Sequence, residues 1–173
     1  ALADLRPVFF DRIGKKMFMR IGVNTGPAVV GNLGSRTRFD YTMLGDAVNL
    51  AARLEGVNKQ FGTYTMISAA TCSQMGEGFA VRELARVAVV GKKEPVTVYE
   101  PMWPSVYEER RPVLSVFSEA LSLFYAGRFL DAAALFARIE DKDPPAARYR
   151  LKCHEMAAAP PELWEGVWVM TSK

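Results

Sequence analysis

The sequence changes character at Trp103 and Pro104. Before this point, short apolar stretches alternate with breaks rich in glycine and proline, whereas the residues after Pro112 are typical of helices. The chain must therefore join a mixed α+β part to a helical part. The tail contains two tryptophans, and we expect it to dock on the rest of the chain. The predicted divisions are a mixed domain over 1–103, a helical extension over 104–158 and a C-terminal tail over 159–173.

Apolar spacing predicts the elements of the mixed part. One helix is expected over 2–13 and another over 47–56, with Asp46 as its cap and Gly56 and Asn58 at its end. The strands, of which the first is expected to be buried, are predicted at 17–23, 28–30, 39–43, 64–68, 79–84, 86–90 and 96–102, with a short helix over 69–75. Hairpin-like spacing late in this run indicates an α+β sheet with helices on one face.

The helical part contains a spaced set of small and aromatic residues. Gly127, Phe129, Ala132, Phe136 and Pro144 resemble the second half of a tetratricopeptide repeat. One such unit cannot build a solenoid. We therefore expect a helical hairpin that packs on its neighbour or on a second copy of the chain.

Composition excludes several classes of function. The net charge is only +3 and the basic residues are scattered, which argues against binding to a nucleic-acid polymer. Cys72 and Cys153 are far apart and form no CxxC, so a disulfide framework or zinc site is not expected and a reducing compartment is favoured. His154, the single histidine, is expected to face solvent. No apolar run is long enough to span a bilayer, no signal peptide is apparent, and the start at Ala1 in mid-helix predicts a fragment.

Two weaker patterns carry no chemistry. Gly26 and Gly31 have the glycine spacing of a phosphate-binding loop, but Asn32 stands where the lysine is needed. Asp40 and Asp46 lie at opposite ends of a strand and turn, so nothing brings them together on a metal. No metal ligand is predicted within this chain.

Asn49 and Arg53 are the candidate functional pair. Residues four apart share one face of a helix, where an arginine fork suits phosphate oxygens and an amide can orient a sugar oxygen or a water. Thr42, at the end of the preceding strand, could place a hydroxyl near a bound base. The alternative is an ordinary surface, with Arg53 paired to Glu55 or Asp46 and Asn49 solvated. Spacing alone favours that alternative.

A family resemblance changes this weighting. The stretch RIGVNTGPAVVGNLGSRTRFDYTMLGDAVNLAARLEGVNKQFGT, followed by VRELARVAVVGKKEPVTVYE, closely resembles the class III nucleotidyl cyclases from about Arg20 to Glu100. The helical hairpin and the WEGVWVMTSK tail also resemble the C-terminal extension of bacterial membrane-associated adenylate cyclases. The resemblance implies the C-terminal part of a ferredoxin-like cyclase domain, followed by a tetratricopeptide-like hairpin.

The resemblance also implies roles for residues. Asn49 would orient the ribose of ATP and Arg53 would stabilise the α-phosphate during conversion to cyclic AMP and pyrophosphate, at the interface of a head-to-tail homodimer. Thr42 favours ATP, because family members that make cyclic GMP usually carry cysteine there. Two Mg²⁺ or Mn²⁺ ions would be held by aspartates of the domain's N-terminal half, which precedes Ala1, so this chain alone is expected to be inactive. The parent would place this domain in the cytoplasm and reach the inner membrane only through a missing N-terminal part.

One departure leaves an alternative open. Val90 stands where the family often has the first lysine of Lys-Gly-Lys, which touches the terminal phosphates, and Lys92 or Lys93 is the candidate to replace it. The alternative is a degenerate, non-catalytic cyclase-like module for regulation or dimerisation. Two aspartates upstream would favour the enzyme, and their absence would favour the module. A tetratricopeptide adaptor would need further repeats, and none is visible.

Overall fold

The computed structural model describes residues 2–35, 38–89 and 94–170. Its helices are α1 (Leu2–Ile13), α2 (Asp46–Phe61), α3 (Ala69–Cys72), α4 (Pro104–Tyr125), α5 (Phe129–Ala137) and α6 (Pro144–Ala158). Its strands are β1 (Ile21–Val23), β2 (Val29–Ser35), β3 (Arg38–Leu44), β4 (Thr65–Ser68), β5 (Ala80–Ala88), β6 (Val96–Met102) and β7 (Trp168–Val169). The predicted α+β class is confirmed.

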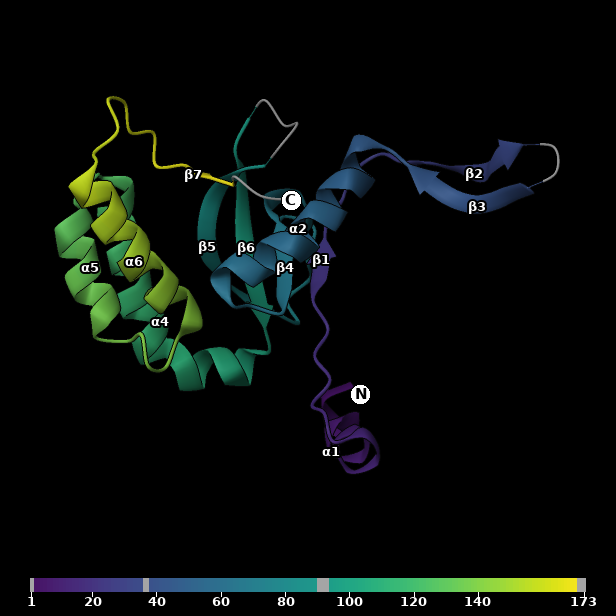
Figure 1. Cartoon of the computed structure of the whole chain (residues 1–173), viewed down its shortest axis with the longest axis horizontal. Coiled ribbons are helices and arrows are strands. Elements are labelled where there is room, and N and C mark those ends of the chain that lie inside the picture. The colour runs from purple at the N-terminus through teal and green to yellow at the C-terminus, as the bar shows by residue number, and fades with distance from the viewer. Residues whose placement is uncertain (1, 36–37, 90–93, 171–173) are drawn as a thin grey trace.

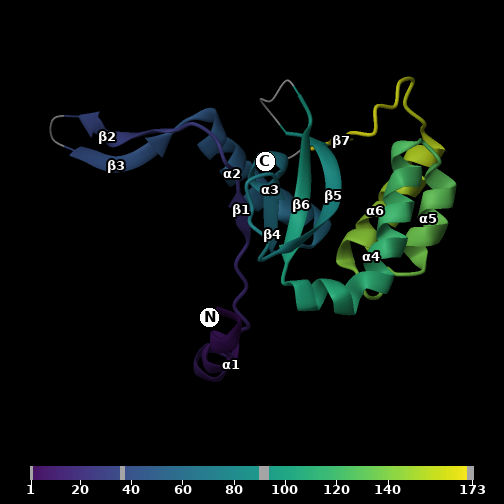
Figure 2. The same ribbon diagram turned by 180° about the vertical axis from the view of Figure 1, so that it is seen from behind.

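The strands form a central sheet and a separate hairpin. The sheet has the order β1-β4-β6-β5-β7; β1 pairs parallel with β4, β7 pairs parallel with β5, and the other neighbours are antiparallel. Strands β2 and β3 form a two-stranded antiparallel hairpin that projects from the body (Figure 1). Helix α1 also stands apart from the body in both views, whereas α4, α5 and α6 gather beside β5 (Figure 2).

Helix α2 packs on the sheet through one apolar face. Its buried apolar side chains recur at helical spacing: Leu50, Leu54, Val57 and Phe61. The predicted end at Gly56 is wrong. This packing continues past Gly56, which is exposed, and outweighs its weak helix propensity.

Glycines mark both ends of α2. The helix begins after Gly45, whose φ of 153° favours glycine, so Asp46 is the first helical residue rather than the predicted cap. It ends at Gly62, which is in the left-handed conformation with φ of 71° and donates its N–H to the Asn58 carbonyl. The helix is therefore fixed in length by its termini and by its apolar face.

Gly22 on β1 allows the backbones of β1 and α2 to approach closely. A Cβ at this position would lie 2.2 Å from the carbonyl oxygen of Ala51 and 2.4 Å from the amide nitrogen of Glu55. Both atoms belong to the helix backbone, which cannot swing aside as a flexible side chain could. Only glycine fits this contact.

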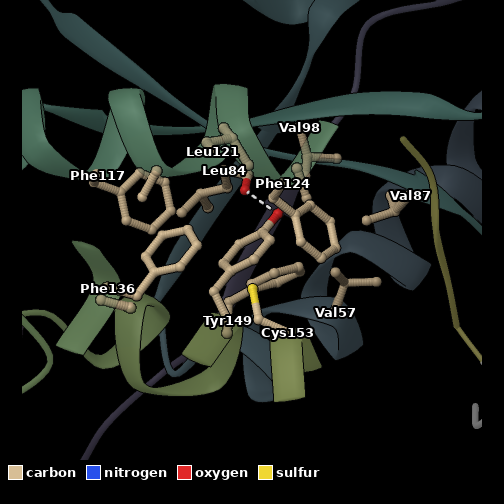
Figure 3. Packing of buried hydrophobic residues seen from close by; sticks show 14 of the residues in the cluster. Val57, Leu84, Val87, Val98, Phe117, Leu121, Phe124, Phe136, Tyr149 and Cys153 are labelled. Atoms are coloured by element: carbon tan, nitrogen blue, oxygen red, sulfur yellow. Dashed lines mark hydrogen bonds between the residues drawn. The ribbon is translucent and has the colours of Figure 1, made fainter. Parts of the chain in front are cut away.

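The helical part shares its core with the sheet. Tyr149 of α6 is fully buried, and its hydroxyl donates a hydrogen bond to the Leu84 carbonyl of β5 at 2.7 Å (Figure 3). Its ring stacks on Phe136 at 4.9 Å and meets Phe124 edge-on at 5.0 Å. The helical hairpin therefore packs on the neighbouring sheet of the same chain. Its tetratricopeptide character and the predicted domain divisions remain predictions.

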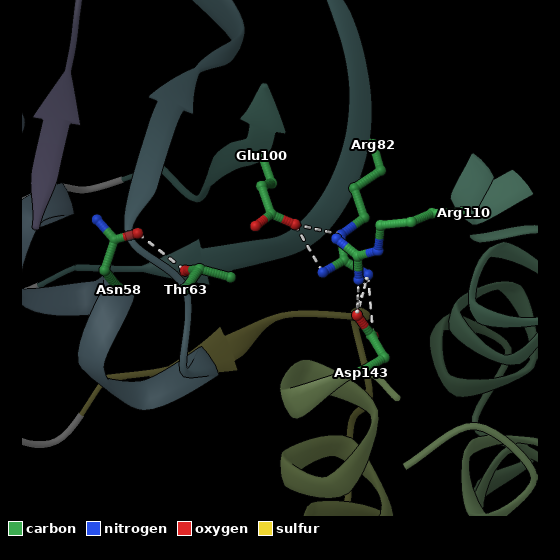
Figure 4. Close-up of polar contacts among 6 residues, drawn as sticks. All are labelled: Asn58, Thr63, Arg82, Glu100, Arg110 and Asp143. Atoms are coloured by element: carbon green, nitrogen blue, oxygen red, sulfur yellow. Dashed lines mark hydrogen bonds and ion pairs between the residues drawn. The ribbon is translucent and has the colours of Figure 1, made fainter. Parts of the chain in front are cut away.

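A buried ion cluster also joins the two parts. Arg82 of β5 pairs with Glu100 of β6 at 2.6 Å and with Asp143 at 2.8 Å. Arg110 of α4 lies 2.7 Å from the same Asp143, which is fully buried just before α6 (Figure 4). Because an unpaired buried charge is very unfavourable, these residues must remain together.

Several predicted boundaries in the sheet differ from the structure. The buried strand predicted at 17–23 is wrong: β1 covers only Ile21–Val23, and Met17, Phe18 and Met19 are exposed. The two strands predicted over 79–90 are one strand, β5, whose register shifts between Glu83 and Ala85. A β-bulge of this kind interrupts side-chain alternation without ending the strand.

Prolines explain the differences in the helical part. Helix α4 begins at Pro104 and contains Pro112, whereas the sequence pattern predicts helical character only after Pro112. Pro144 and Pro145 begin α6 rather than end α5, because proline is favoured in the first turn of a helix. The tail docks as predicted: the indole N–H of Trp164 donates to the Phe124 carbonyl at 2.9 Å.

The remaining composition-based predictions concern single residues and membrane spans. Cys72 and Cys153 are free thiols, and His154 is exposed as expected. Among the residues that the structure describes, no helix combines the length and the apolar character needed to cross a bilayer.

Candidate active site

The N-terminal end of α2 is held by Asn24, which follows β1. Its side-chain amide donates to the Ala47 carbonyl at 3.0 Å, and its Oδ1 accepts a hydrogen bond from Ser68 Oγ at 2.6 Å. A side chain that bonds both the helix and β4 fixes the helix start against the sheet. Asn49 lies half a turn beyond this anchor.

The C-terminal end of α2 has a second amide anchor. Asn58 is fully buried, and its Nδ2 donates to the Ile21 carbonyl of β1 at 3.0 Å. Its Oδ1 accepts from the Thr63 hydroxyl at 2.8 Å (Figure 4). The two anchors leave α2 little freedom to rotate or slide, so the side chains on its outer face are pre-positioned.

Asn49 and Arg53 lie on that outer face, one turn apart. Asn49 is exposed and Arg53 is half-buried. Arg53 makes no ion pair with any other residue that the structure describes, and its Nη1 is buried without a hydrogen-bond partner. A buried guanidinium nitrogen lacking a partner is unfavourable unless an anion or a polar ligand completes it.

The pair lines one pocket of about 560 Å³. The lining residues are Arg20, Asn49, Ala52, Arg53, Glu55, Gly56, Val57, Lys59, Gln60, Val89 and Met170. Three of them are cationic and one is anionic, so the pocket carries an excess of positive charge. Such a pocket attracts a polyanion such as a nucleoside triphosphate.

The other predicted substrate residues are not brought to this pocket. Thr42 is exposed on β3, where it faces Gly31 across the hairpin, and it does not line the pocket. Lys92 and the departure at Val90 lie outside the described residues. The roles of Thr42 and Lys92 therefore remain predictions.

Sequence reasoning missed several pocket residues. Gln60 continues the series Asn49, Arg53, Gly56 at helical spacing, so extending the helix past Gly56 would have found it. Met170 had no local signal, because it reaches the pocket from the far end of the chain. Only the three-dimensional pairing of the tail with β5 reveals it.

The described residues do not fit a two-metal site. No group of three or more histidine, cysteine, aspartate or glutamate side chains converges among them. Magnesium and manganese prefer several carboxylate and other oxygen ligands, whereas Glu55 is the single carboxylate among the described lining residues. The pocket is therefore better suited to an anionic or polar ligand than to a metal ion.

Comparison with known proteins places the chain in a family. The model of the adenylate and guanylate cyclase catalytic domain matches residues 3–100, more than half of the chain. Members of this family are generally metal-dependent. The crystal structure of the adenylyl cyclase CyaB from P. aeruginosa is similar with a TM-score of 0.51 and 34% identity, covering 58% of this chain and 51% of that one.

Curated proteins that are similar in sequence to this chain include adenylate cyclases. Adenylate cyclase 1 of Rhizobium meliloti (strain 1021) is 41% identical over 81 residues, which are 47% of this chain and 12% of that protein. The terminal-differentiation-specific adenylate cyclase of Dictyostelium discoideum is 30% identical over 143 residues, which are 77% of this chain and 7% of that protein. The chain thus spans only about a tenth of the length of these relatives. From the family match, the sequence identity and the shared fold, we conclude that the chain belongs to the family of adenylate and guanylate cyclase catalytic domains.

Proposed function

We propose that the chain is the C-terminal part of an adenylate cyclase, which converts ATP to cyclic AMP and pyrophosphate. The observation that carries this proposal is the placement of Asn49 and Arg53 side by side in a positively charged pocket, with the buried Nη1 of Arg53 lacking a partner. The names of the relatives support ATP as the substrate.

The two side chains divide the work on the substrate. Asn49 orients the ribose so that its 3′ oxygen faces the α-phosphorus. As that oxygen loses its proton and bonds to phosphorus, the bond to the bridging oxygen of pyrophosphate breaks. Arg53 stabilises the negative charge on the α-phosphate oxygens during this exchange. A fixed cation stabilises the transition state more than the ground state only if it is positioned in advance. The Asn24 and Asn58 anchors of α2 provide this positioning for Arg53.

The complete site requires a second copy of the chain. In the proposed head-to-tail dimer, the outer face of α2 meets a nucleotide held by the partner. The hairpin supports association, because Val29 is 71% and Tyr41 is 76% exposed. Apolar side chains gathered on a projecting hairpin are typical of a protein interface.

The metal ions of the family belong to residues outside this chain. Two Mg²⁺ or Mn²⁺ ions, when bound, would supply further charge stabilisation for the phosphates. Because no three or more metal-ligating side chains converge among the described residues, we predict that the isolated chain produces no cyclic AMP. Measurable cyclic AMP from the purified chain alone would contradict this.

The test of the proposed function is Arg53→Ala in the complete cyclase. We expect kcat for cyclic AMP formation to fall by about 10³-fold or more, with a much smaller change in KM, because Arg53 acts in the transition state. Arg128→Ala is the matched control: Arg128 is exposed and pairs with Asp131, so its removal should leave kcat unchanged. An unchanged kcat for Arg53→Ala would remove the assigned role. Activity with GTP equal to that with ATP would remove the assignment of Thr42.

A further inference from the structure

The C-terminal tail forms part of the pocket that contains Asn49 and Arg53. Strand β7 pairs parallel with β5, with Trp168 opposite Val87 and Val169 opposite Ala88. The Met170 N–H then donates to the Ala88 carbonyl at 3.0 Å. This register places Met170 beside Val89, and both side chains line the pocket.

Two tryptophans anchor the tail on its way to the pocket. Trp164 meets Phe124 and Phe129 of the helical unit edge-on, at 5.0 and 5.3 Å between ring centroids. Trp168 meets Phe61 of α2 at 5.1 Å and Tyr149 of α6 at 4.9 Å. Trp164 therefore attaches the tail to the helical unit, and Trp168 attaches it to both the helical unit and α2.

The last two described residues of the tail face opposite sides. Val169 is 62% exposed, whereas Met170 is only 7% exposed. This is the alternation of a strand, with one side chain toward solvent and the next toward the core. It makes Val169 a matched control for Met170, since the two share the same backbone segment.

We propose that Met170 is a positioning residue of the nucleotide site, and that the tail Trp164–Met170 links the helical extension to this site. Together with Val89, Met170 supplies an apolar part of the pocket wall against which the bound nucleotide rests. The helical extension thereby sets the width of the pocket. This inference rests on the proposed function, because it takes the ligand of the pocket to be the substrate ATP.

The test compares charge rather than size at the two tail positions. Met170→Glu and Met170→Gln, both similar in volume to methionine, are prepared in the complete cyclase with Val169→Glu and Val169→Gln. A carboxylate beside the triphosphate repels it and competes for Arg53, so KM for ATP should be at least about fivefold higher for Met170→Glu than for Met170→Gln at low salt. The ratio should shrink in high salt, and the two Val169 variants should have equal KM values.

The outcomes separate this inference from the proposed function. Equal KM values for folded Met170→Glu and Met170→Gln overturn the role of Met170, even where Arg53→Ala abolishes turnover. If Arg53→Ala retains full turnover, the proposed function fails whatever the tail variants do. Circular dichroism establishes that each variant is folded.

A second measurement applies if the charged variants do not fold. Met170→Cys and Val169→Cys are placed in a Cys72→Ala background and alkylated with and without ATP. We expect ATP to slow alkylation at position 170 by at least about threefold while leaving position 169 unchanged, because a bound ligand occludes only the residue that faces it. Equal rates at position 170 with and without ATP overturn the proposal.

Discussion

The elements before β4 and those after it differ in what their apolar side chains contact. In the earlier part, the hairpin and the segment before β1 expose large apolar residues such as Val29, Tyr41 and Phe18. In the later part, side chains of the same kind, including Phe117 and Phe124, are almost completely buried against the sheet and the helices. Both parts are rich in apolar residues, so composition does not explain the difference.

The contrast shows which part of the chain is stabilised by contacts within the chain itself. After β4, the sheet and the helical unit share one continuous core with internal hydrogen bonds and ion pairs. Among the described elements before β4, only α2 contributes buried side chains to that core; β1 pairs with β4 but leaves Ile21 and Val23 exposed, and the apolar surface of the β2–β3 hairpin has no cover within the described structure. We infer that the earlier part completes its packing with other polypeptide, which fits the proposed dimer.

The largest effect should come from breaking the buried ion cluster of the later part. Asp143→Ala leaves the buried guanidinium of Arg82 without one of its two carboxylates, and we expect the free energy of unfolding to fall by about 3–5 kcal/mol. The control, Asp131→Ala, removes an exposed pair with Arg128 and should cost at most about 1 kcal/mol. Urea denaturation measures both, and equal losses would show that burial is not what makes the cluster important.

A smaller effect should appear at alkaline pH. Burial raises the pKa of the Cys153 thiol from its usual 9.0 to about 12. The unfolded chain therefore loses this proton at lower pH than the folded chain does, so stability is fully present below pH 9 and falls as pH rises toward 12. Burial likewise raises the pKa of Tyr149, which adds to the same trend.

Cys153→Ala tests that assignment. The variant should lose stability less steeply than the parent chain when pH rises above 9, and the remaining slope should come from Tyr149, Tyr125 and Tyr99, whose pKa values burial also raises. Unfolding in urea at several alkaline pH values gives this slope directly. A slope that stays the same in Cys153→Ala would exclude the thiol as a source of alkaline instability.

The smallest effect on stability should come from the exposed hairpin. Tyr41→Ser and Leu130→Ser both replace exposed apolar residues, and each should change the free energy of unfolding by no more than about 0.5 kcal/mol. Their effects on association should differ: Tyr41→Ser should weaken dimerisation of the complete cyclase, whereas Leu130→Ser on α5 should not. Analytical ultracentrifugation compares the two, and an equally strong dimer in both variants would argue against the hairpin as an interface.

Much of the fold was predictable from local patterns. The apolar face of α2 and the helical run follow from residue spacing and from glycine and proline positions. The strand predicted at 28–30 is too short, because β2 continues through Gly31 and Gly34 to Ser35 in its pairing with β3. The errors arose where tertiary packing outweighed a local signal. Gly56 is tolerated inside α2 because Val57 and Phe61 are buried beyond it, and the bulge near Glu83 made one strand resemble two.

The site was predictable only in part, for a similar reason. Asn49 and Arg53 share a helix face, so one short segment contains the information that brings them together. Arg82 and Asp143 are 61 residues apart, and Met170 is farther still from Arg53. Nothing local marks such pairs, because their contact depends on how the helical unit folds back onto the sheet.

Because Gly22 has no Cβ, β1 and α2 are packed so closely that they should move together as one rigid unit. Because the two backbones are in direct contact at Gly22, no side chains lie between them that could rearrange and allow α2 to slide along β1. Any opening or closing of the cleft around Arg53 must then carry strand and helix together. Adding even one methyl group at position 22 would push α2 away from β1 and so displace Asn49 and Arg53, although position 22 does not line the pocket.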